Sequence, residues 1–450
     1  MSDCGEMRAD IAIVGGGMAG VTLALMLAAA RRNWRVVIIE SFDFPRRDSA
    51  MATADQSSSP QDGPQSSVNS RQPLFYQPSF DARSTALAAG SVEILTDLGV
   101  WQGLAQNATP IRQVHVSDKG HFGASLIDSE TYGLPALGYV LENSWMGAVL
   151  LNALQRQPNL TCLAPATVRS LFPRRGGAEL LVSSREPAWE KRLWCQLAVI
   201  ADGADSPLRQ SLGIDVQITD YRQVAVVANV AFDRPHRGIA YERFTATGPL
   251  ALLPLDGSPQ GQRSALVWTL PKEQAQLMMA LSDAEFMQRL QQRFGYRLGR
   301  FLKLGQRHDY PLQRVLACEQ VRSSLVMMGN AAHFLHPVAG QGFNLALRDC
   351  AALAETLSQA ATDGWPLGHL HVLERYLRTQ NLDQMLTAGF SDTLIKLFSS
   401  ATQPLALGRT LGFFGLDLLP PAKHILAAQT MGRAGRQVHV APCLSTAALR

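Results

Sequence analysis

The sequence predicts an α/β fold in which a Rossmann-like dinucleotide-binding domain is interleaved with an α+β domain containing an antiparallel sheet, followed by C-terminal helices. Three observations predict this arrangement. A strand, a glycine-rich turn, a helix and a second strand follow one another within the first 40 residues. Strand-like runs fill residues 221–269, and the pattern beyond about Glu355 is helical. Strands that alternate with helices form parallel sheets, whereas consecutive short strands form antiparallel ones, so these regions belong to different layers.

The N-terminal unit reads as one βαβ crossover. Residues 11–14 and Val36–Ile39 are short apolar runs rich in β-branched side chains, as expected for buried parallel strands. The segment Met18–Ala30, rich in leucine and alanine, is predicted to be the helix between them. The unit starts near residue 10, so any dinucleotide that it binds is held by the first elements of the fold.

The turn of this unit carries the motif G-x-G-x-x-G at Gly15, Gly17 and Gly20. The first glycine permits a tight turn, the second lets a pyrophosphate approach the backbone, and the third allows close packing of helix and strand. Glu40 ends the second strand twenty positions after Gly20, where a carboxylate accepts the hydroxyls of an adenosine ribose and disfavours a 2′-phosphate. The motif therefore predicts FAD or NAD rather than NADP, in preference to a βαβ turn without a ligand.

Composition describes a large globular protein with a rather apolar surface. The 450 residues are 46% hydrophobic and 17% charged, with a formal net charge of +4. Basic residues are scattered, which argues against a nucleic-acid-binding groove. We expect a cytoplasmic protein, since there is neither an apolar signal segment near the N-terminus nor an uncharged run of about 20 apolar residues. The cysteines have no C-x-x-C spacing, are expected to be reduced thiols, and are Cys4, Cys162, Cys195, Cys318, Cys350 and Cys443.

Two features follow the first unit. Residues 48–71 are rich in Ser, Gln, Pro, Asp and Gly, and we predict a disordered surface insertion there. Arg83 then precedes a segment read as the start of a helix that runs through Leu98. An arginine at such a position neutralises a pyrophosphate or forms a surface ion pair, and its position alone leaves both interpretations open.

The middle of the chain continues the alternation. A helix is predicted over Asn143–Gln155, and residues 193–200 form a buried strand that ends in the acidic turn Asp202-Gly203. Ser206 is expected to cap the next helix, with Pro207 at its first position. Residues 221–269 then predict an antiparallel sheet that roofs a pocket over the cofactor.

A second glycine-rich stretch begins at Gly329-Asn330, after a buried strand. Gly340 and Gly342 permit close backbone approach, and a helix that starts near Asn344 offers its first N–H groups to an electron-rich ligand. The pair His333 and His336 suggests a metal site only weakly, because no carboxylate and cysteine set accompanies it. No metal is therefore predicted.

These motifs, in this order and spacing, resemble those of the FAD-dependent aromatic hydroxylases of the p-hydroxybenzoate hydroxylase type, over essentially the whole chain. Residues 81–90, 115–120, 241–254 and 340–345 look like the ubiquinone-biosynthesis branch, and within it like the hydroxylases of 2-polyprenyl-6-methoxyphenol. Most of the family has Asp where this chain has Asn330, which can bond to a ribitol hydroxyl but carries no charge.

The resemblance implies a role for each motif. Glu40 would bind the adenosine ribose, Arg83 the pyrophosphate region and Asn330 the ribitol chain. Asp202 and Gly203 would lie on the pyrophosphate side. The loop residues that approach the flavin pyrimidine would be Gly340, Gly342, Phe343 and Asn344.

The implied activity is monooxygenation of 2-polyprenyl-6-methoxyphenol to 2-polyprenyl-6-methoxy-1,4-benzoquinol in ubiquinone biosynthesis, through a C4a-hydroperoxyflavin. FAD is the cofactor, O2 the co-substrate, and NAD(P)H or another donor supplies electrons. No general base is assigned; His336, Pro337 and Tyr241 are candidates for lining the pocket, and residues 241–243 are expected to face it from the sheet. Hydroxylation at another ring position and a prenyl-lipid flavin reductase remain alternatives, as does a non-catalytic flavoprotein.

The implied organisation is discontinuous, and its C-terminal part has two interpretations. Residues 403–428 form either a core or dimer helix or a surface through which a membrane-dissolved substrate enters, with peripheral contact at the inner face of the membrane. Expected partners are a lipid-like phenol and other ubiquinone-biosynthesis proteins, and no nucleic acid. The expected parts are FAD-binding residues 1–110, substrate-domain residues 111–145, FAD-binding residues 146–215, substrate-domain residues 216–315, FAD-binding residues 316–355, and C-terminal helices with a tail at 356–450.

Overall fold

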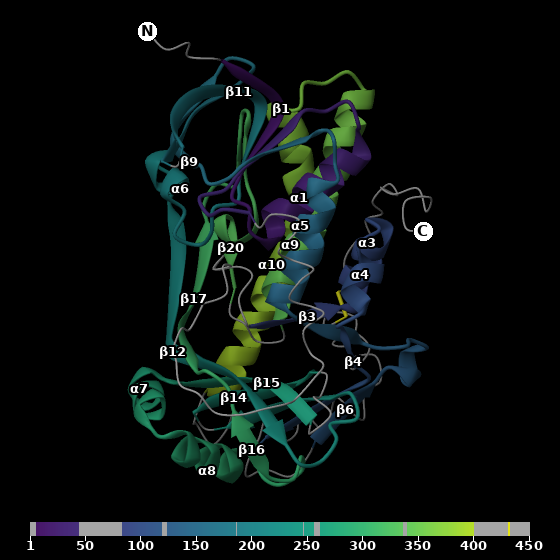
Figure 1. The fold of residues 1–450 in the computed structure, drawn as a ribbon, viewed down its shortest axis with the longest axis vertical. Coiled ribbons are helices and arrows are strands. Elements are labelled where there is room, and N and C mark those ends of the chain that lie inside the picture. Colours follow the sequence, from purple (N-terminus) through teal and green to yellow (C-terminus); the bar gives the residue numbers. More distant parts are fainter. Residues whose placement is uncertain are drawn as a thin grey trace, which may run out of the picture.

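The computed structural model describes residues 6–44, 83–118, 124–185, 187–245, 247–255, 262–335, 340–399 and 431–432. It has a mainly parallel sheet with helices at one end and a larger, mainly antiparallel sheet at the other (Figure 1). The predicted α/β fold class is confirmed. The insertion predicted at 48–71 and the helix predicted at 403–428 lie outside the described residues. Within them, no helix combines the length and the apolar character that crossing a membrane requires.

The parallel sheet is built on the predicted N-terminal unit. Its strands pair in the order β18-β19-β11-β1-β2-β8, and a β9–β10 hairpin extends β11. The helix α1 (Met18–Ala30) and the strand β2 (Val36–Ile39) have the predicted bounds. The other strands are β1 (Met7–Val14), β8 (Leu160–Leu163), β9 (Thr167–Arg174), β10 (Gly177–Arg185), β11 (Ala188–Ile200), β18 (Val321–Arg322) and β19 (Leu325–Met327).

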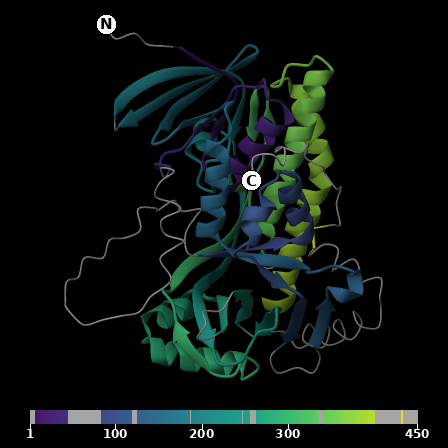
Figure 2. The ribbon, with the colours of Figure 1, turned by 45° about the vertical axis from the view of Figure 1, so that its right-hand side comes forward.

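Both faces of this sheet are buried, which explains its continuous apolar runs. Ile11 and Ile13 of β1 point into a core shared with α1, α5 (Asn143–Gln155) and α9 (Gln341–Thr362). Ala12 and Val14 point to the other face, where the β9–β10 hairpin covers them. The long α9 and α10 (Leu370–Ser399) run from this sheet toward the antiparallel sheet (Figure 2).

The antiparallel sheet pairs in the order β20-β17-β12-β15-β14-β13-β5-β6, with β16 beside β12 and one parallel pair, β13 with β5. Its helices α7 (Lys272–Ala280) and α8 (Asp283–Phe294) cover one face through a core around Trp268 and Phe286. The strands are β5 (Gln113–Asp118), β6 (Ala124–Asp128), β12 (Val216–Phe232), β13 (Ile239–Thr245), β14 (Gly248–Leu255), β15 (Gln262–Pro271), β16 (Phe301–Leu304), β17 (His308–Ala317) and β20 (His333–Phe334).

A small third sheet joins the two large ones. Its strands β3 (Ser84–Ala88), β7 (Gly138–Glu142) and β4 (Thr109–Ile111) pair in that order. The helices α3 (Ala89–Asp97) and α4 (Trp101–Ala105) follow β3, and the short helices η1 (Glu130–Tyr132), α6 (Pro207–Ser211) and η2 (Gly329–Ala331) complete the described elements. The expectation that Arg83 enters a helix is wrong, because the residues after it pair with β7 as a strand before α3 begins.

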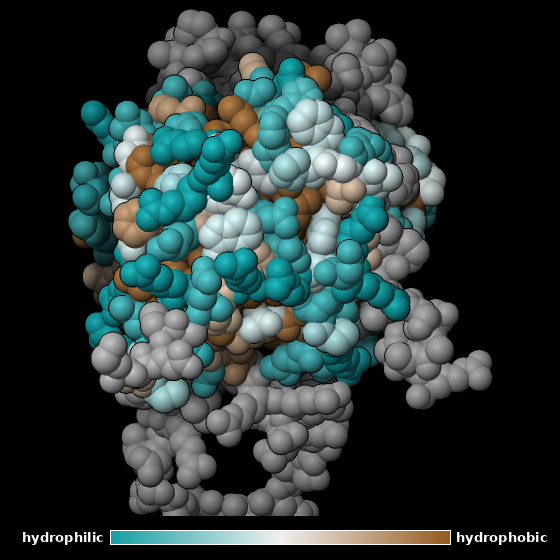
Figure 3. All heavy atoms as spheres, turned by 90° about the horizontal axis from the view of Figure 1, so that it is seen from above, coloured by the Kyte–Doolittle hydropathy of each residue, from teal (hydrophilic) through white to brown (hydrophobic). Residues whose placement is uncertain are grey.

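The surface at the end of the molecule that carries the parallel sheet is mainly hydrophilic, with hydrophobic side chains scattered among the polar ones (Figure 3). The apolar content of the described chain is instead concentrated inside, in the cores on both sides of the parallel sheet and under α7 and α8.

Candidate active site

A single cavity of about 1180 Å³ extends from the glycine-rich turn after β1 to the open face of the antiparallel sheet. This volume exceeds the roughly 300–1,000 Å³ of a typical small-molecule site, so the cavity has room for a cofactor and a substrate together. Gly20 does not line it. The predicted site residues that do are Gly15, Gly17, Glu40, Arg83, Asp202, Gly203, Tyr241, Asn330, Gly340, Gly342, Phe343 and Asn344.

Two glycines of the first turn are required by close backbone contacts. Gly15 has φ +109°, and a Cβ there would lie 2.3 Å from the carbonyl oxygen of Ala201 at the end of β11. A Cβ on Gly20 would lie 1.9 Å from the carbonyl oxygen of Gly15. Side chains at either position would push α1 and β11 away from the turn.

The Glu40 carboxylate is folded against its own turn. Its Oε2 accepts a 2.6 Å hydrogen bond from the N–H of Gly16, and its Oε1 accepts bonds from the Ser41 hydroxyl at 2.9 Å and the Phe42 N–H at 3.0 Å. A carboxylate has about four lone-pair sites, so a further acceptor site remains for a ribose hydroxyl. The side chain also fixes the shape of the turn, a role that the motif alone does not reveal.

Arg83 lines the cavity just before β3, and its guanidinium lies 4.8 Å from the centre of the Tyr310 ring on β17. This cation–π contact connects the cofactor end of the cavity to the antiparallel sheet. Arg83 therefore lies in the cavity wall, and its role at a pyrophosphate stays a prediction.

The turn Asp202-Gly203 follows β11 as predicted, and Ser206 caps α6 by accepting a 3.0 Å bond from the N–H of Arg209, with Pro207 at the first helical position. Burial raises the pKa of Asp202, while hydrogen bonds, first among them one with Ser206, act in the opposite direction. The Oδ1 atom of Asp202 is buried without a hydrogen-bond partner among the described residues. An unsatisfied acceptor in a cavity wall is suited to a ligand hydroxyl or amide.

Arg209 holds this turn next to the second glycine-rich stretch. Its buried guanidinium donates to the carbonyl oxygen of Ala331 at 2.9 Å and to that of Ala204 at 2.7 Å. The predictions did not include this residue, because an arginine inside a short helix has no sequence signal that distinguishes it from surface charge.

In the second stretch, Asn330 is exposed to the cavity and available to a ligand. Asn344, in contrast, uses its amide within the protein. Its Oδ1 accepts from the N–H of Ala88 at 2.8 Å, and its Nδ2 donates to the carbonyl oxygens of Ala86 at 2.8 Å and Gly340 at 2.7 Å. These bonds fix the N-terminus of α9 against β3, and the first N–H groups of α9, which lack intrahelical acceptors, open toward the cavity.

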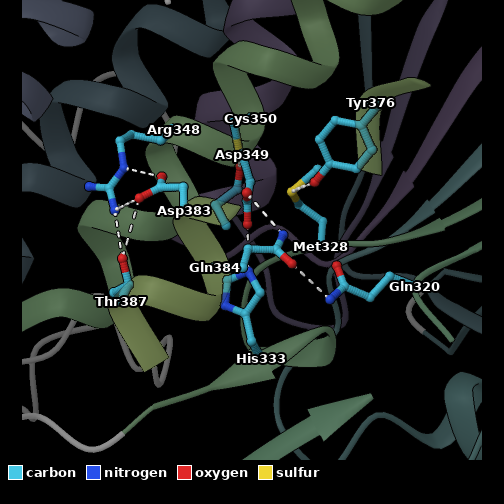
Figure 4. A network of polar contacts seen from close by, with 11 residues as sticks. Gln320, Met328, His333, Arg348, Asp349, Cys350, Tyr376, Asp383, Gln384 and Thr387 are labelled. Atoms are coloured by element: carbon cyan, nitrogen blue, oxygen red, sulfur yellow. Dashed lines mark hydrogen bonds and ion pairs between the residues drawn. The ribbon is translucent and has the colours of Figure 1, made fainter. Parts of the chain in front are cut away.

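Behind this loop lies a buried polar network (Figure 4). The His333 ring bonds to Asp349 at 2.5 Å, Gln384 donates to Asp349 at 3.1 Å, and Gln320 donates to Gln384 at 2.9 Å. The network connects β20, α9 and α10, so His333 is structural here. His336 and Pro337 lie outside the described residues.

Tyr241 and Glu242 are consecutive residues of β13 that both line the cavity. The Tyr241 ring packs edge-on against Phe294 of α8, with 5.4 Å between the ring centres. Glu242 falls within the range 241–243 that was expected to face the pocket, but it was not singled out as a candidate. The signal that identifies it is the period-two alternation of a strand, in which residues 240, 242 and 244 share the face opposite to Tyr241.

Two family profiles match the sequence. One, described as an FAD binding domain, matches residues 68–372, and another, described as an FAD dependent oxidoreductase, matches residues 10–102. The first spans more than half of the chain.

Relatives of known name match nearly the full length. The chain is 33% identical to ubiquinone hydroxylase UbiL of Rhodospirillum rubrum, over 94% of this chain and 90% of that protein. It is 30% identical to 3-demethoxyubiquinol 3-hydroxylase of Escherichia coli, over 91% of this chain and 94% of that protein. It is 27% identical to the mitochondrial ubiquinone biosynthesis monooxygenase COQ6 of Xenopus tropicalis, over 95% of this chain and 94% of that protein.

Solved structures share the fold. p-Nitrophenol 4-monooxygenase PnpA from Pseudomonas putida superposes with a TM-score of 0.72 at 17% identity, over 96% of this chain and 100% of that one. PqsL from Pseudomonas aeruginosa, described as a probable FAD-dependent monooxygenase, superposes with a TM-score of 0.68 at 19% identity, over 91% of this chain and 100% of that one.

The cavity fits the FAD that the family profiles name. The turn at Gly15 and Gly17 lets a pyrophosphate approach the backbone at the start of α1, and Arg83 adds a positive charge. Asn330 presents amide atoms that a ribitol chain can satisfy, Asp202 presents a carboxylate oxygen without a partner among the described residues, and the N-terminus of α9 suits an electron-rich ring edge.

Proposed function

The chain belongs to the FAD-dependent monooxygenase family that includes the ubiquinone-biosynthesis hydroxylases, and we propose that it hydroxylates the ring of a polyprenylated phenol. The substrate we assign is 2-polyprenyl-6-methoxyphenol, and the product is 2-polyprenyl-6-methoxy-1,4-benzoquinol. The names of its relatives, ubiquinone hydroxylase and ubiquinone biosynthesis monooxygenase, support this substrate class.

The observation that carries the proposal is the composition of the cavity beyond the cofactor region. The antiparallel sheet contributes small or apolar side chains from five adjacent strands to this wall: Val114, Val116, Ala225, Val227, Ala240, Phe244, Ala251, Leu253 and Val267. An aromatic ring with an isoprenoid substituent buries its surface favourably against such a wall. A small polar substrate would gain little there.

When bound, FAD supplies activation of O2, with electrons that come from NAD(P)H or another donor. The chain has three tasks. Its glycine turn, Arg83 and the N-terminus of α9 hold the cofactor, and its sheet face orients the ring. The apolar wall also keeps water out, which favours transfer of oxygen to the ring over release of hydrogen peroxide. One atom of O2 enters the ring as a hydroxyl group and the other leaves as water.

The test is product analysis with ¹⁸O2. The purified holoprotein receives a flavin-reducing system and 2-polyprenyl-6-methoxyphenol in detergent. One ¹⁸O atom in the ring of the 1,4-hydroquinone supports the proposal.

Two other results contradict it in different ways. If the label appears at a different ring position, or only when a demethoxyubiquinol is the substrate, the protein catalyses another hydroxylation of the same pathway. The name of the Escherichia coli relative, 3-demethoxyubiquinol 3-hydroxylase, suggests such a reaction. Substrate reduction without oxygen uptake identifies a reductase instead.

A further inference from the structure

We propose that Glu242 is the proton acceptor for the substrate's phenolic hydroxyl, an assignment that rests on the proposed function. The residue lies in the middle of β13 and lines the cavity from the antiparallel sheet. It carries a carboxyl group on a wall whose other members are mostly apolar.

The neighbours of Glu242 on the sheet are small or apolar. Its cross-strand partners are Ala251 on β14 and Val116 on β5, and both line the same cavity. The side chain forms no ion pair or hydrogen bond with any part of the chain that the structure describes. A carboxyl group that points into a cavity without a protein partner is available to a ligand hydroxyl.

Burial raises the pKa of Glu242 from 4.5 to about 7, with no opposing contribution from a charged neighbour. Charged and titratable groups on the surrounding elements are Arg83 before β3, Tyr310 on β17 and Asp118 on β5. The helix α10 packs against β13 as well, and its Asp392 is paired with Arg314. Arg243 points to the other face of the sheet, where it donates to the carbonyl oxygen of Phe294 at 3.0 Å. A base with a pKa near the working pH is suited to proton transfer, because it is substantially ionised and still basic.

The wall that holds Glu242 is continuous with the cofactor loop. A Cβ on Gly340, the cap of α9, would lie 3.3 Å from the Ala86 side chain on β3. Ala86 in turn packs against a cluster that contains Ala240, which shares a face of β13 with Glu242. A ring seated on this face therefore shares one cavity with the start of α9 and the Glu242 carboxyl group.

The proton balance is simple. The phenolic O–H bond breaks and an O–H bond forms on the Glu242 carboxylate, which leaves a phenolate whose para carbon is more electron-rich and accepts the oxygen atom delivered at the FAD. The hydrogen on that ring carbon then leaves as a proton when aromaticity is restored. Glu242 returns its own proton to the former phenolate oxygen, so the residue is unchanged after each turnover.

The first experiment compares the wild type with Glu242→Gln and Glu242→Asp as FAD-loaded proteins. We expect the wild-type rate of ring hydroxylation to rise about tenfold between pH 6 and pH 8, because only the carboxylate accepts the proton. In Glu242→Gln the rate at pH 8 should fall by about 10²-fold or more, the rise with pH should vanish, and hydrogen peroxide release should increase. Glu242→Asp should recover part of the rate and the pH dependence.

The matched control is Asp309→Asn. Asp309 lies on β17 of the same sheet but is exposed, so this variant should behave as the wild type. The visible spectrum of bound FAD and the thermal unfolding midpoint report whether each variant is folded. Equal rates and equal pH profiles for the wild type and Glu242→Gln would overturn the assignment.

A binding measurement separates this inference from the proposed function. Without reductant, 2-farnesyl-6-methoxyphenol and its methyl ether are titrated into the holoprotein, and the change in the FAD spectrum is followed. The wild type should bind the phenol about tenfold or more tightly than the ether, and Glu242→Leu should bind both equally. If this preference depends on Glu242 but the wild type forms no labelled product, the proposed function fails and the contact between Glu242 and the hydroxyl stands. If labelled product forms but Glu242→Leu keeps the preference, the assignment of Glu242 fails alone.

Discussion

The substitution Asn344→Asp tests whether the side chain of Asn344 positions the N-terminus of α9 for the cofactor. Asp has nearly the same shape as Asn, and its oxygen can still accept the bond from the Ala88 N–H. It has no N–H groups, so the bonds to the carbonyl oxygens of Ala86 and Gly340 are lost. An oxygen of the carboxylate would then face two carbonyl oxygens at the former distances of 2.8 and 2.7 Å.

The expected cost follows from these contacts. Two hydrogen bonds of about 1 kcal/mol each contribute about 2 kcal/mol, and the repulsion between the oxygens adds to it. The positive end of the α9 dipole offsets part of that repulsion, typically by about 0.3–1 kcal/mol. If FAD binds only the ordered form of the loop, a net loss of about 2 kcal/mol lowers FAD affinity by about 30-fold.

The assay is a fluorescence titration of apoprotein with FAD, and the matched control is Asn330→Asp in the same loop. Asn330 faces the cavity and bonds to no other described residue, so its replacement by Asp should leave FAD affinity within about threefold of the wild-type value or increase it. Wild-type affinity in Asn344→Asp, or an equal loss in both variants, would refute the idea that the Asn344 side chain holds the loop.

Two further substitutions test the turn and the buried network. In Gly20→Ala, the new Cβ would lie 1.9 Å from the Gly15 carbonyl oxygen, so the purified protein should lose most of its FAD, as its flavin absorbance would show. Gly389→Ala, in α10 with no atom within 4 Å of the new Cβ, should keep its FAD, and loss from both variants would contradict the steric argument. Asp349→Ala should lower the free energy of unfolding by about 2–5 kcal/mol, since it leaves His333 and Gln384 without their buried acceptor. Its control, Glu319→Gln, breaks a half-exposed ion pair with Arg322 and should cost less than about 1 kcal/mol in the same denaturation experiment; a similar change in both would count against the network.

Elements with strong local signals were predicted to the residue. Met18–Ala30, Val36–Ile39 and Asn143–Gln155 have the bounds that composition and flanking turns indicate. The cap at Ser206 is also confirmed. These features depend on side chains within a few positions of one another, and the sequence shows such neighbours directly.

Features that depend on distant partners were not predicted. The segment after Arg83 is a strand because β7, more than fifty residues later, pairs with it from Glu142 back to Gly138. Composition alone favours a helix there, since Ala and Leu dominate. Likewise β12 extends over 17 residues because β17 and β15 pair with successive parts of it.

The position of the proposed base follows from the same distinction. Residues 241–243 were expected to face the pocket together, but a strand presents alternate residues to opposite faces. The pairing of Glu242 with Ala251 and of Tyr241 with Leu252 decides which side each takes. Leu252 belongs to the core under α7 and α8, so the Tyr241 ring packs into that core although the residue also borders the cavity, whereas Glu242 faces the cavity from the opposite side of the strand. A shift of one residue in this register would bury the carboxyl group against Phe294 and place the aromatic ring in the cavity. The strand register that places Tyr241 in the apolar core therefore also places the Glu242 carboxyl group on the cavity face. The sequence alone does not show this register, because it depends on the cross-strand partners in β14.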